Sequence, residues 1–454
     1  MTRARILYLH ESGRLLGLTL PLLLAQVFQT AMGVVDTVMA GRYSALDLAG
    51  VAVGSSLFFP LYLFMVGVLG AVPPLVAQAD GRGDTAAIGR VVRQGMLIGL
   101  LLGTIMLLVV RESSRVLVLM GVSPEVLPVT VGYLRAIAWG MPVVGLFLAL
   151  RGTCEGVSLP KMTTVAGLIG LMVNMGMNAV LIYGRFGLPE LGGVGCGYAT
   201  ALSMLVMLLV LVVLLQWNRR TRRLEIFCPE IRHLCIGLTK PLRLGLPIGL
   251  ALFIECSIFS VIALFIARLG AEVVAAHQIA LNFASLVFML PYSLAAALTV
   301  RVGFAAGRQR PERLRRTVRV GLWLAAGCAC CTALIYFTSA PLIAAMYSPD
   351  PAVAGLATSL LLFAGLFQLP DAIQVNCAGA LRGLNDTRVP MLLLIFAYWG
   401  IGLPVGWILG ISGFWGLPQG PQGFWVGLIS GLSVAALLLS WRLRWQLRHL
   451  SGSR

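Results

Sequence analysis

Three carboxylic acids lie inside long apolar stretches of the chain, where a charged side chain is costly. Asp36, Glu255 and Asp371 have no Lys or Arg within the same stretch. An acid at the centre of a membrane-spanning helix costs about 2.5–3.5 kcal/mol on insertion scales. Each acid must therefore take up a proton, bind a cation or face water, as a cation-coupled carrier requires. The alternative is a neutral acid that only joins neighbouring helices through a hydrogen bond.

The three acids differ in their depth within these stretches. Glu255 lies near the middle of its stretch, between Arg243 and Arg268, whereas Asp36 lies nearer one end of its own. Glu255 and Asp371 both belong to the second half of the chain and could share one ion or proton. We therefore predict a coupling-ion site, for Na⁺ or H⁺, at Glu255 and Asp371.

Amide side chains recur one helical turn apart in other apolar stretches. Gln278 and Asn282 are four residues apart, and so are Asn174 and Asn178. This spacing places each pair on one face of a helix. Ligand contact and hydrogen bonding between helices are equally compatible with the pattern.

Twelve apolar stretches provide the elements that must position these side chains. Hydrophobic residues make up 59% of the 454 residues and charged residues only 11%. Soluble domains carry about 25% charged residues, so a soluble protein is excluded. A membrane span needs about 20 largely apolar residues. The predicted spans are 15–41, 46–78, 91–110, 126–150, 162–183, 194–216, 244–267, 273–300, 320–342, 352–379, 389–411 and 422–441.

Basic residues mark one side of the membrane. Of 34 Lys and Arg residues, 28 fall at the two ends of the chain and in the connections after even-numbered spans. The positive-inside rule then predicts that both termini are cytoplasmic. We interpret the basic runs as anchors beside anionic lipid, and expect no nucleic-acid partner. The nine Cys and four His residues show no zinc-type spacing, so no metal cofactor is expected.

An internal repeat of about 226 residues divides the chain into two halves. At this shift Pro21 matches Pro247, and each half contains six predicted spans. Because six is even, both halves have the same orientation. We expect an all-α polytopic membrane protein with two six-helix lobes, residues 1–228 and 229–454, related by a pseudo-two-fold axis along the membrane normal. Two lobes in one chain make a monomer sufficient.

Three segments resemble the multidrug and toxic compound extrusion (MATE) family, specifically its bacterial NorM branch. They read PLLLAQVFQTAMGVVDTVMAG, AAHQIALNFASLVFMLPYS and NMGMNAVLIYGRFGLPELGGVGCGYATA, and the resemblance extends from about residue 10 to 445. It implies a multi-pass protein of the bacterial inner membrane. It also implies export of cationic organic drugs and dyes in exchange for Na⁺ or H⁺, by alternating access between two lobes.

The resemblance also implies roles for particular residues. In similar proteins the ion site of the second lobe uses acids at the positions of Glu255 and Asp371, with an aromatic side chain at that of Phe288. Some relatives carry Tyr at this position, and Phe288 lacks the hydroxyl that would favour sodium. Further site positions implied in this way are Asp36, Asn174 and Asn178 in a first-lobe cluster, and Gln278 and Asn282 in the cavity.

Two rival functions fit the residues less well. A lipid-linked oligosaccharide flippase shares the broad architecture, but would need basic cavity residues for a pyrophosphate headgroup, whereas this chain offers acids at mid-span. An intramembrane enzyme is the other class. The chain has no HExxH, GxSxG or aspartate-rich Mg²⁺ motif, so we expect that it is not an enzyme.

Overall fold

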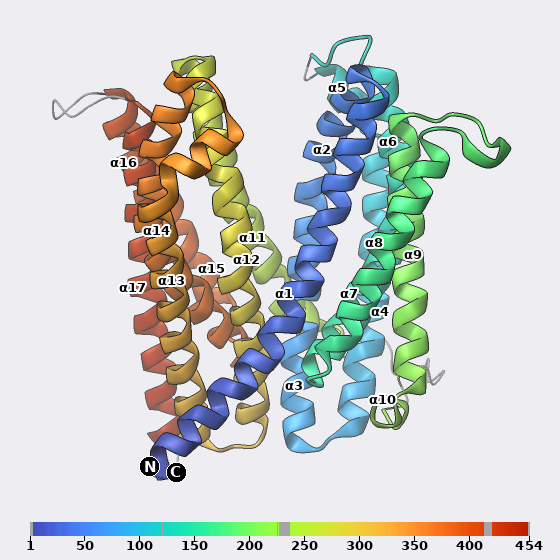
Figure 1. Cartoon of the computed structure of the whole chain (residues 1–454). Helices are drawn as coiled ribbons and strands as arrows, with labels where there is room; N and C mark the ends of the chain where they lie inside the picture. The colour runs from blue at the N-terminus through green and yellow to red at the C-terminus, as the bar shows by residue number, and fades with distance from the viewer. Residues whose placement is uncertain (1–2, 120, 225, 227–236, 413–419, 453–454) are drawn as a thin grey trace. The chain divides into compact units, whose positions relative to one another are not determined.

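The computed structural model describes residues 3–452 except 120, 225, 227–236 and 413–419, and this part of the chain is almost entirely helical (Figure 1). Among the described residues, eleven helices are long and apolar enough to cross a membrane. A twelfth span is formed when Leu127–Ala138 and Gly140–Gly156, bent by 44°, are taken as one. The predicted all-α fold with twelve spans is therefore confirmed.

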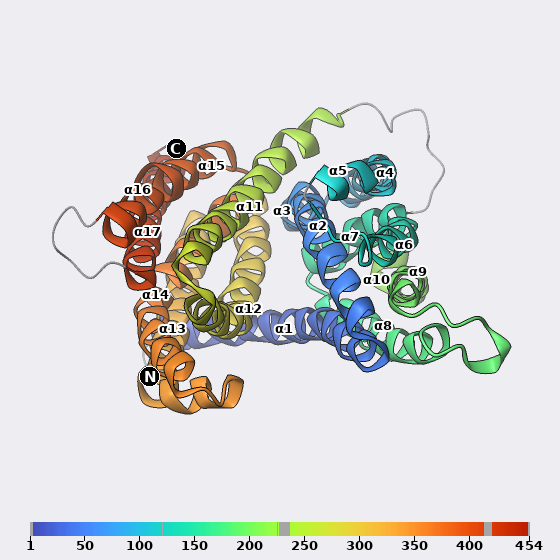
Figure 2. The same ribbon diagram turned by 90° about the horizontal axis from the view of Figure 1, so that it is seen from above.

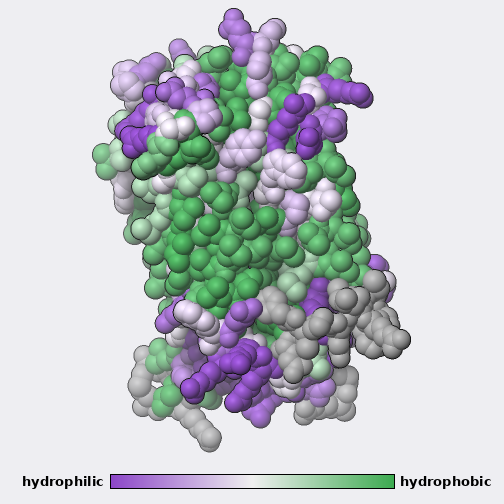
Figure 3. Space-filling model, turned by 90° about the vertical axis from the view of Figure 1, so that its right-hand side faces the viewer, coloured by the Kyte–Doolittle hydropathy of each residue, from purple (hydrophilic) through white to green (hydrophobic). Residues whose placement is uncertain are grey.

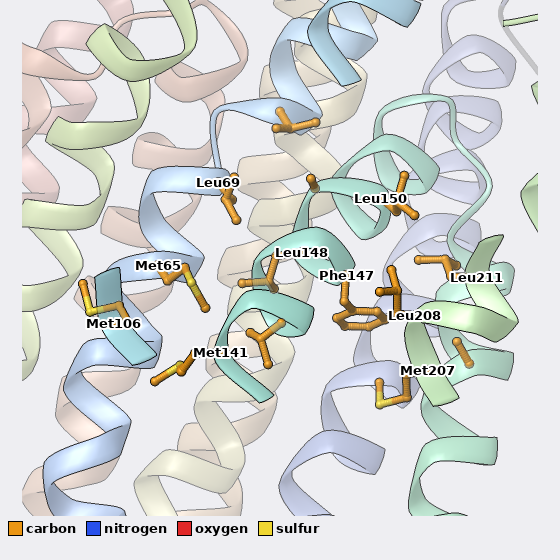
Figure 4. Close-up of a cluster of buried hydrophobic side chains, with 14 of the residues drawn as sticks. Met65, Leu69, Met106, Met141, Phe147, Leu148, Leu150, Met207, Leu208 and Leu211 are labelled. Carbon is orange, nitrogen blue, oxygen red and sulfur yellow. The ribbon is translucent and has the colours of Figure 1, made fainter. Parts of the chain in front are cut away.

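Residues 20–249 form one compact unit, called here the N-terminal unit. Its core lies among the second, fourth, seventh and ninth helices, where Met65, Phe147 and Leu211 are fully buried (Figure 4). Its helices are α1 (Arg3–Tyr43, from residue 20), α2 (Ala45–Leu69), α3 (Val72–Arg82), α4 (Thr85–Arg111), α5 (Ser114–Leu119), α6 (Leu127–Ala138), α7 (Gly140–Gly156), α8 (Pro160–Leu181), the short turn η1 (Arg185–Gly187), α9 (Gly193–Trp217), α10 (Arg219–Arg222) and the start of α11 (Thr239–Ile266).

Residues 1–19 and 250–454 form the other compact unit, the C-terminal unit. Within it α14 contacts α12, α13 and α17, and these helices lie side by side when seen from above (Figure 2). Its elements after α11 are η3 (Ala267–Leu269), α12 (Ala271–Gly307), α13 (Pro311–Tyr347), α14 (Pro351–Gly383), α15 (Arg388–Ile395), the π-helical η4 (Phe396–Gly402), α16 (Leu403–Trp407), the π-helical η5 (Ile408–Ser412) and α17 (Pro421–Gly452). The predicted boundary between residues 228 and 229 lies outside the described residues.

Several helices begin at a residue whose side chain caps the first turn. Asp84 accepts a hydrogen bond from the backbone N–H of Ala87 over 2.8 Å at the start of α4. Asp350 does the same for Ala352 over 2.9 Å at the start of α14. A cap of this kind satisfies a backbone donor that would otherwise lack a partner. Short polar residues between apolar stretches therefore determine where these spans begin.

Glycines allow α4 and α7 to pack backbone against backbone. A methyl group added to Gly99 would collide with the backbone of Gly145, and one added to Gly103 would collide with that of Met141. Small residues spaced four apart permit such close packing of helices in a membrane. The two helices therefore tolerate no larger side chain at this contact.

Exposed apolar side chains form the surface expected to face lipid. Leu168 and Met172 of α8 and Leu205 and Leu209 of α9 are all exposed. Figure 3 shows a band of hydrophobic surface between two hydrophilic ends on one face of the molecule. A continuous apolar surface of this size indicates contact with lipid rather than water.

A buried ion pair holds the start of α1 in the C-terminal unit. Arg301 of α12 donates from Nε and Nη2 to Oε1 of Glu11, over 3.0 and 2.6 Å. Thr317 of α13 donates to the same oxygen over 2.9 Å. A buried charge pair of this kind persists only when its geometry and hydrogen bonds are good. These contacts explain why residues 1–19 belong to this unit while the rest of α1 belongs to the N-terminal unit.

Candidate functional site

Glu255 of α11 and Asp371 of α14 meet around one amide group in the C-terminal unit. Nε2 of Gln374 donates to Oε1 of Glu255 over 3.1 Å and to Oδ1 of Asp371 over 3.4 Å. Asp371 and Gln374 are 3% and 1% exposed, and Glu255 is half-buried. The two acids predicted to share an ion are therefore joined by a common neutral donor.

Tyr398 is a member of this site that no sequence pattern indicates. Its hydroxyl donates to Oε1 of Glu255 over 3.1 Å, and its side chain is fully buried. The residue lies on η4, a π-helical segment, and such segments are rare and often occur at functional sites. It carries the only hydroxyl in the predicted span 389–411, which is too weak a signal to single it out.

Each acid of the site keeps one oxygen that accepts no hydrogen bond from the described residues. These atoms are Oε2 of Glu255 and Oδ2 of Asp371, and neither acid joins an ion pair with a described Lys, Arg or His. The donors that do reach the site are a neutral amide and a neutral hydroxyl. Two acids with open oxygens and no basic partner are suited to a proton or a small hard cation, which prefers oxygen ligands.

Polar side chains continue beside Asp371 along α13 and α14. Gln368 lies three residues before Asp371 and accepts a hydrogen bond from Thr332 over 3.3 Å. Tyr336 is also fully buried, and within the described chain its hydroxyl has no hydrogen-bond partner. The polar interior of this unit therefore extends along these two helices beyond the acids themselves.

Asp36 of α1 forms a second cluster, in the N-terminal unit. Its Oδ1 accepts hydrogen bonds from Nδ2 of Asn178 and Asn174, over 2.6 and 3.1 Å. Its Oδ2 accepts one from the hydroxyl of Thr200 over 2.7 Å. All four side chains are buried. The structure thus brings the predicted set of Asp36, Asn174 and Asn178 together and adds Thr200, which the amide spacing could not reveal.

The donors around Asp36 are also bonded to one another. Asn178 donates to Oδ1 of Asn174 over 3.2 Å, and Asn174 reaches the hydroxyl of Thr200 over 3.3 Å. Cys196 of α9 donates to the backbone oxygen of Asp36 over 3.7 Å. Both oxygens of this acid are therefore occupied by neutral donors in a network spanning three helices.

The other predicted site residues lie on α12, apart from these hydrogen-bond networks. Gln278 and Asn282 are exposed, and neither makes a hydrogen bond to any part of the chain that the structure describes. Phe288 is half-buried and packs against Tyr292 with ring centroids 5.8 Å apart. Among the described residues, Gln278 and Asn282 therefore have no hydrogen-bond partner, whereas Phe288 has an aromatic neighbour.

A third network joins α1, α2 and α7 in the N-terminal unit. Arg151 and Glu155, four residues apart, form an ion pair of 2.8 Å. Arg151 also donates to Oε1 of Gln29 over 2.8 Å, and Gln29 in turn donates to Tyr62 over 3.2 Å. The pair is local and largely neutralised, so it offers no charge to a ligand.

The chain matches the MatE family model twice, over residues 21–180 and 247–408. The two matches begin 226 residues apart, which is the interval of the internal repeat in the sequence. Together they cover most of the chain.

Curated relatives and solved structures agree with this match. The probable multidrug resistance protein NorM of Shewanella oneidensis is 44% identical over 439 residues, covering 97% of this chain and 96% of that protein. The multidrug resistance protein PmpM of Pseudomonas aeruginosa is 47% identical, covering 95% and 91%. The crystal structure of the eukaryotic MATE transporter AtDTX14 superposes with a TM-score of 0.87 at 19% identity, covering 98% and 99%, and shows the shared fold. The chain therefore belongs to the MatE family, whose members are membrane transporters and not enzymes.

Proposed function

We propose that this transporter exports organic cations, including drugs and dyes, in exchange for Na⁺ or H⁺ bound at Glu255 and Asp371. The supporting observation is the pair of acids with open oxygens and no basic partner in the described chain. The names of the two bacterial relatives, both multidrug resistance proteins, support the substrate class. An acidic site disfavours the anionic headgroup of a lipid-linked oligosaccharide, which leaves the flippase as the weaker alternative.

Competition for negative charge couples the two fluxes in this proposal. A cation or protons at Glu255 and Asp371 neutralise the acids, so a bound cationic drug loses its counter-charge and leaves. Release of the ion on the other side restores the charge and allows a new drug to bind. Each ligand shifts the population of conformations only through its different affinity for them. Alternating access then needs no further energy source.

The apolar helices and the two bacterial relatives support a location in the bacterial inner membrane. We further propose that both termini are cytoplasmic, because 28 of the 34 basic residues fall on one side of the predicted spans. The monomer is the proposed functional form. The proposed roles of Asp36, Gln278, Asn282 and Phe288 are ion coupling for the first and drug contact for the others.

Dye efflux from proteoliposomes tests the coupling proposal. The purified chain is reconstituted, and efflux is driven either by a Na⁺ gradient or by a pH gradient, each imposed alone. One of these gradients is expected to drive efflux. Glu255→Gln and Asp371→Asn each remove one acid at nearly constant volume. They are expected to lower ion-driven efflux about tenfold or more, as expected for one lost contact with a charged group.

Glu272→Gln provides the matched control. Glu272 is an exposed acid in the first turn of α12 in the same unit, and it is not part of the site. This variant should transport as the unaltered chain does. Full ion-driven efflux by both Glu255→Gln and Asp371→Asn would refute the proposal.

A further inference from the structure

The turn between α12 and α13 has the same backbone conformation as its repeat counterpart, the turn between α3 and α4, but a different charge. Gln309 and Gly83, 226 residues apart, both have left-handed backbone, with φ of 53° and 75°. The next residue in the N-terminal unit is Asp84, which caps α4. Arg310 takes that place in the C-terminal unit and makes no capping hydrogen bond with its side chain. The N-cap position of α13 therefore carries an arginine where its counterpart carries the capping carboxylate.

Three guanidinium groups surround one aromatic ring beside this turn. The Cζ atoms of Arg308, Arg313 and Arg301 lie 4.9, 5.7 and 6.0 Å from the ring centroid of Phe304. Arg301 is neutralised by Glu11. Arg308 and Arg313 form no ion pair with any residue that the structure describes. Two unpaired cations thus lie against the same ring, where their mutual repulsion needs a compensating anion.

Nearby acids do not compensate this charge. Glu312, in the first turn of α13, is exposed and carries a single negative charge. Asp386 is paired with Arg442 over 2.7 Å. Further arginines on the same turn and the start of α13 are Arg310, Arg315, Arg316 and Arg319, and Arg14 of α1 also acts electrostatically on Arg313. Glu11 also acts electrostatically on Arg313, but it already pairs with Arg301, so this cluster keeps a net positive charge among the described residues.

The counterpart region of the N-terminal unit shows that the excess charge is not required by the fold. There Asp84 caps the helix, and Asp80 forms an ion pair with Arg220 over 2.9 Å. Residues 80–93 carry two acids and three arginines, whereas the matching residues 306–319 carry one acid and six arginines. A difference in charge on an unchanged backbone indicates a difference in what the surface binds.

We propose that Arg308, Arg313 and the uncapped start of α13 bind the phosphodiester headgroup of an anionic phospholipid. Backbone N–H groups at a helix start attract anions, and guanidinium groups hold phosphate oxygens through charged hydrogen bonds. Arginine clusters at the ends of membrane spans bind anionic lipid headgroups in this way. The cluster lies at the adjoining ends of α12 and α13, which are both candidate membrane spans. This inference is independent of the drug and ion sites.

Native mass spectrometry of the whole chain tests the lipid site. The detergent-solubilised protein is incubated with phosphatidylglycerol or, separately, with phosphatidylcholine. Retained phosphatidylglycerol is expected, with little phosphatidylcholine, and inorganic phosphate should not displace it. The double variant Arg308→Gln/Arg313→Gln should bind phosphatidylglycerol about tenfold more weakly, because it loses two charged contacts. The matched control is Arg222→Gln/Arg223→Gln, which removes two exposed arginines from the end of α10 and the residue after it.

A second variant separates lipid binding from folding. Arg310→Asp recreates the cap that Asp84 provides in the other repeat, so the melting temperature should stay equal or rise while phosphatidylglycerol binding falls severalfold. Equal loss in the two double variants would mean that only general surface charge attracts the lipid, and would overturn the proposal. So would full lipid affinity in Arg310→Asp, or equal retention of phosphatidylcholine and phosphatidylglycerol by the unaltered chain.

Discussion

The two acid clusters of this transporter differ in how many of their oxygens are in use. Asp36 has both carboxylate oxygens occupied by donors from Asn174, Asn178 and Thr200. Glu255 and Asp371 each leave one oxygen without a donor among the described residues. The N-terminal cluster is therefore a closed hydrogen-bond network, and the C-terminal cluster is an open one.

This difference distinguishes two roles for an acid in a membrane span, which are stabilising the fold and binding an ion. In the N-terminal cluster both oxygens of Asp36 are satisfied, while Oδ1 of Asn178 is buried without a hydrogen-bond partner among the described residues. An acid whose oxygens are all in use mainly contributes to stability, because removing it breaks buried hydrogen bonds. An open network can accept an ion without first breaking bonds. Ion coupling at Asp36 remains a prediction, and it requires that an ion displace at least one of the present donors.

The largest expected effect on stability is that of Asp36→Ala. This change removes three hydrogen bonds to a buried carboxylate and leaves the Thr200 hydroxyl without its acceptor, and should lower the free energy of unfolding by about 3 kcal/mol or more. Glu255→Ala, in the open network, should cost about 1 kcal/mol. Thermal unfolding of both detergent-solubilised variants measures the difference. A greater loss in Glu255→Ala than in Asp36→Ala would contradict the distinction between closed and open clusters.

Tyr398→Phe should have an intermediate effect, on ion use rather than on stability. It removes one of the two donors that hold Glu255, and a hydrogen bond to a charged group contributes about 1.5 kcal/mol. The ion concentration that gives half-maximal efflux should change about tenfold, with the maximal rate retained. Tyr347→Phe, at an exposed tyrosine of the same unit, is the control. An unchanged ion dependence in Tyr398→Phe would remove this residue from the site.

The smallest effect is expected at the exposed amides of α12. Asn282→Ala should change the free energy of unfolding by less than about 0.5 kcal/mol, because the side chain makes no hydrogen bond within the described chain. Asn178→Ala, which removes a donor to Asp36, should cost about 1–2 kcal/mol. Denaturation of the two variants under identical conditions compares them. Equal losses would show that Asn282 has a structural partner after all.

The spans could be predicted from sequence because their signal is local. Apolar length alone located all twelve spans. The predicted span 320–342 is nevertheless much shorter than the helix it belongs to, α13 (Pro311–Tyr347). Arginines extend this helix beyond its apolar part, and a search for apolar stretches does not detect such an extension. The 44° bend between α6 and α7 was also not predicted, although Pro142 in the first turn of α7 removes the backbone hydrogen bond to the carbonyl of Ala138 and so favours a kink there.

The acids of the site could be found from sequence, but their partners could not. Asp36, Glu255 and Asp371 stand out because a charge inside an apolar stretch is rare. Thr200 and Tyr398 do not, because Thr and Tyr are common at packed helix surfaces. Their roles depend on which helices pack together and, for Tyr398, on the changed register of a π-helical turn.

The ion pair of Glu11 with Arg301 has a consequence for the order of synthesis. The N-terminal unit is continuous in sequence and can close while the chain is still being made. The C-terminal unit is not continuous in sequence, because Glu11 pairs with Arg301, which lies 290 residues later in the chain. At ribosomal rates of about 5–20 residues per second, that delay is roughly 15–60 s. Helix α1 therefore carries an acid whose contact with Arg301 can form only after the whole N-terminal unit has been synthesised.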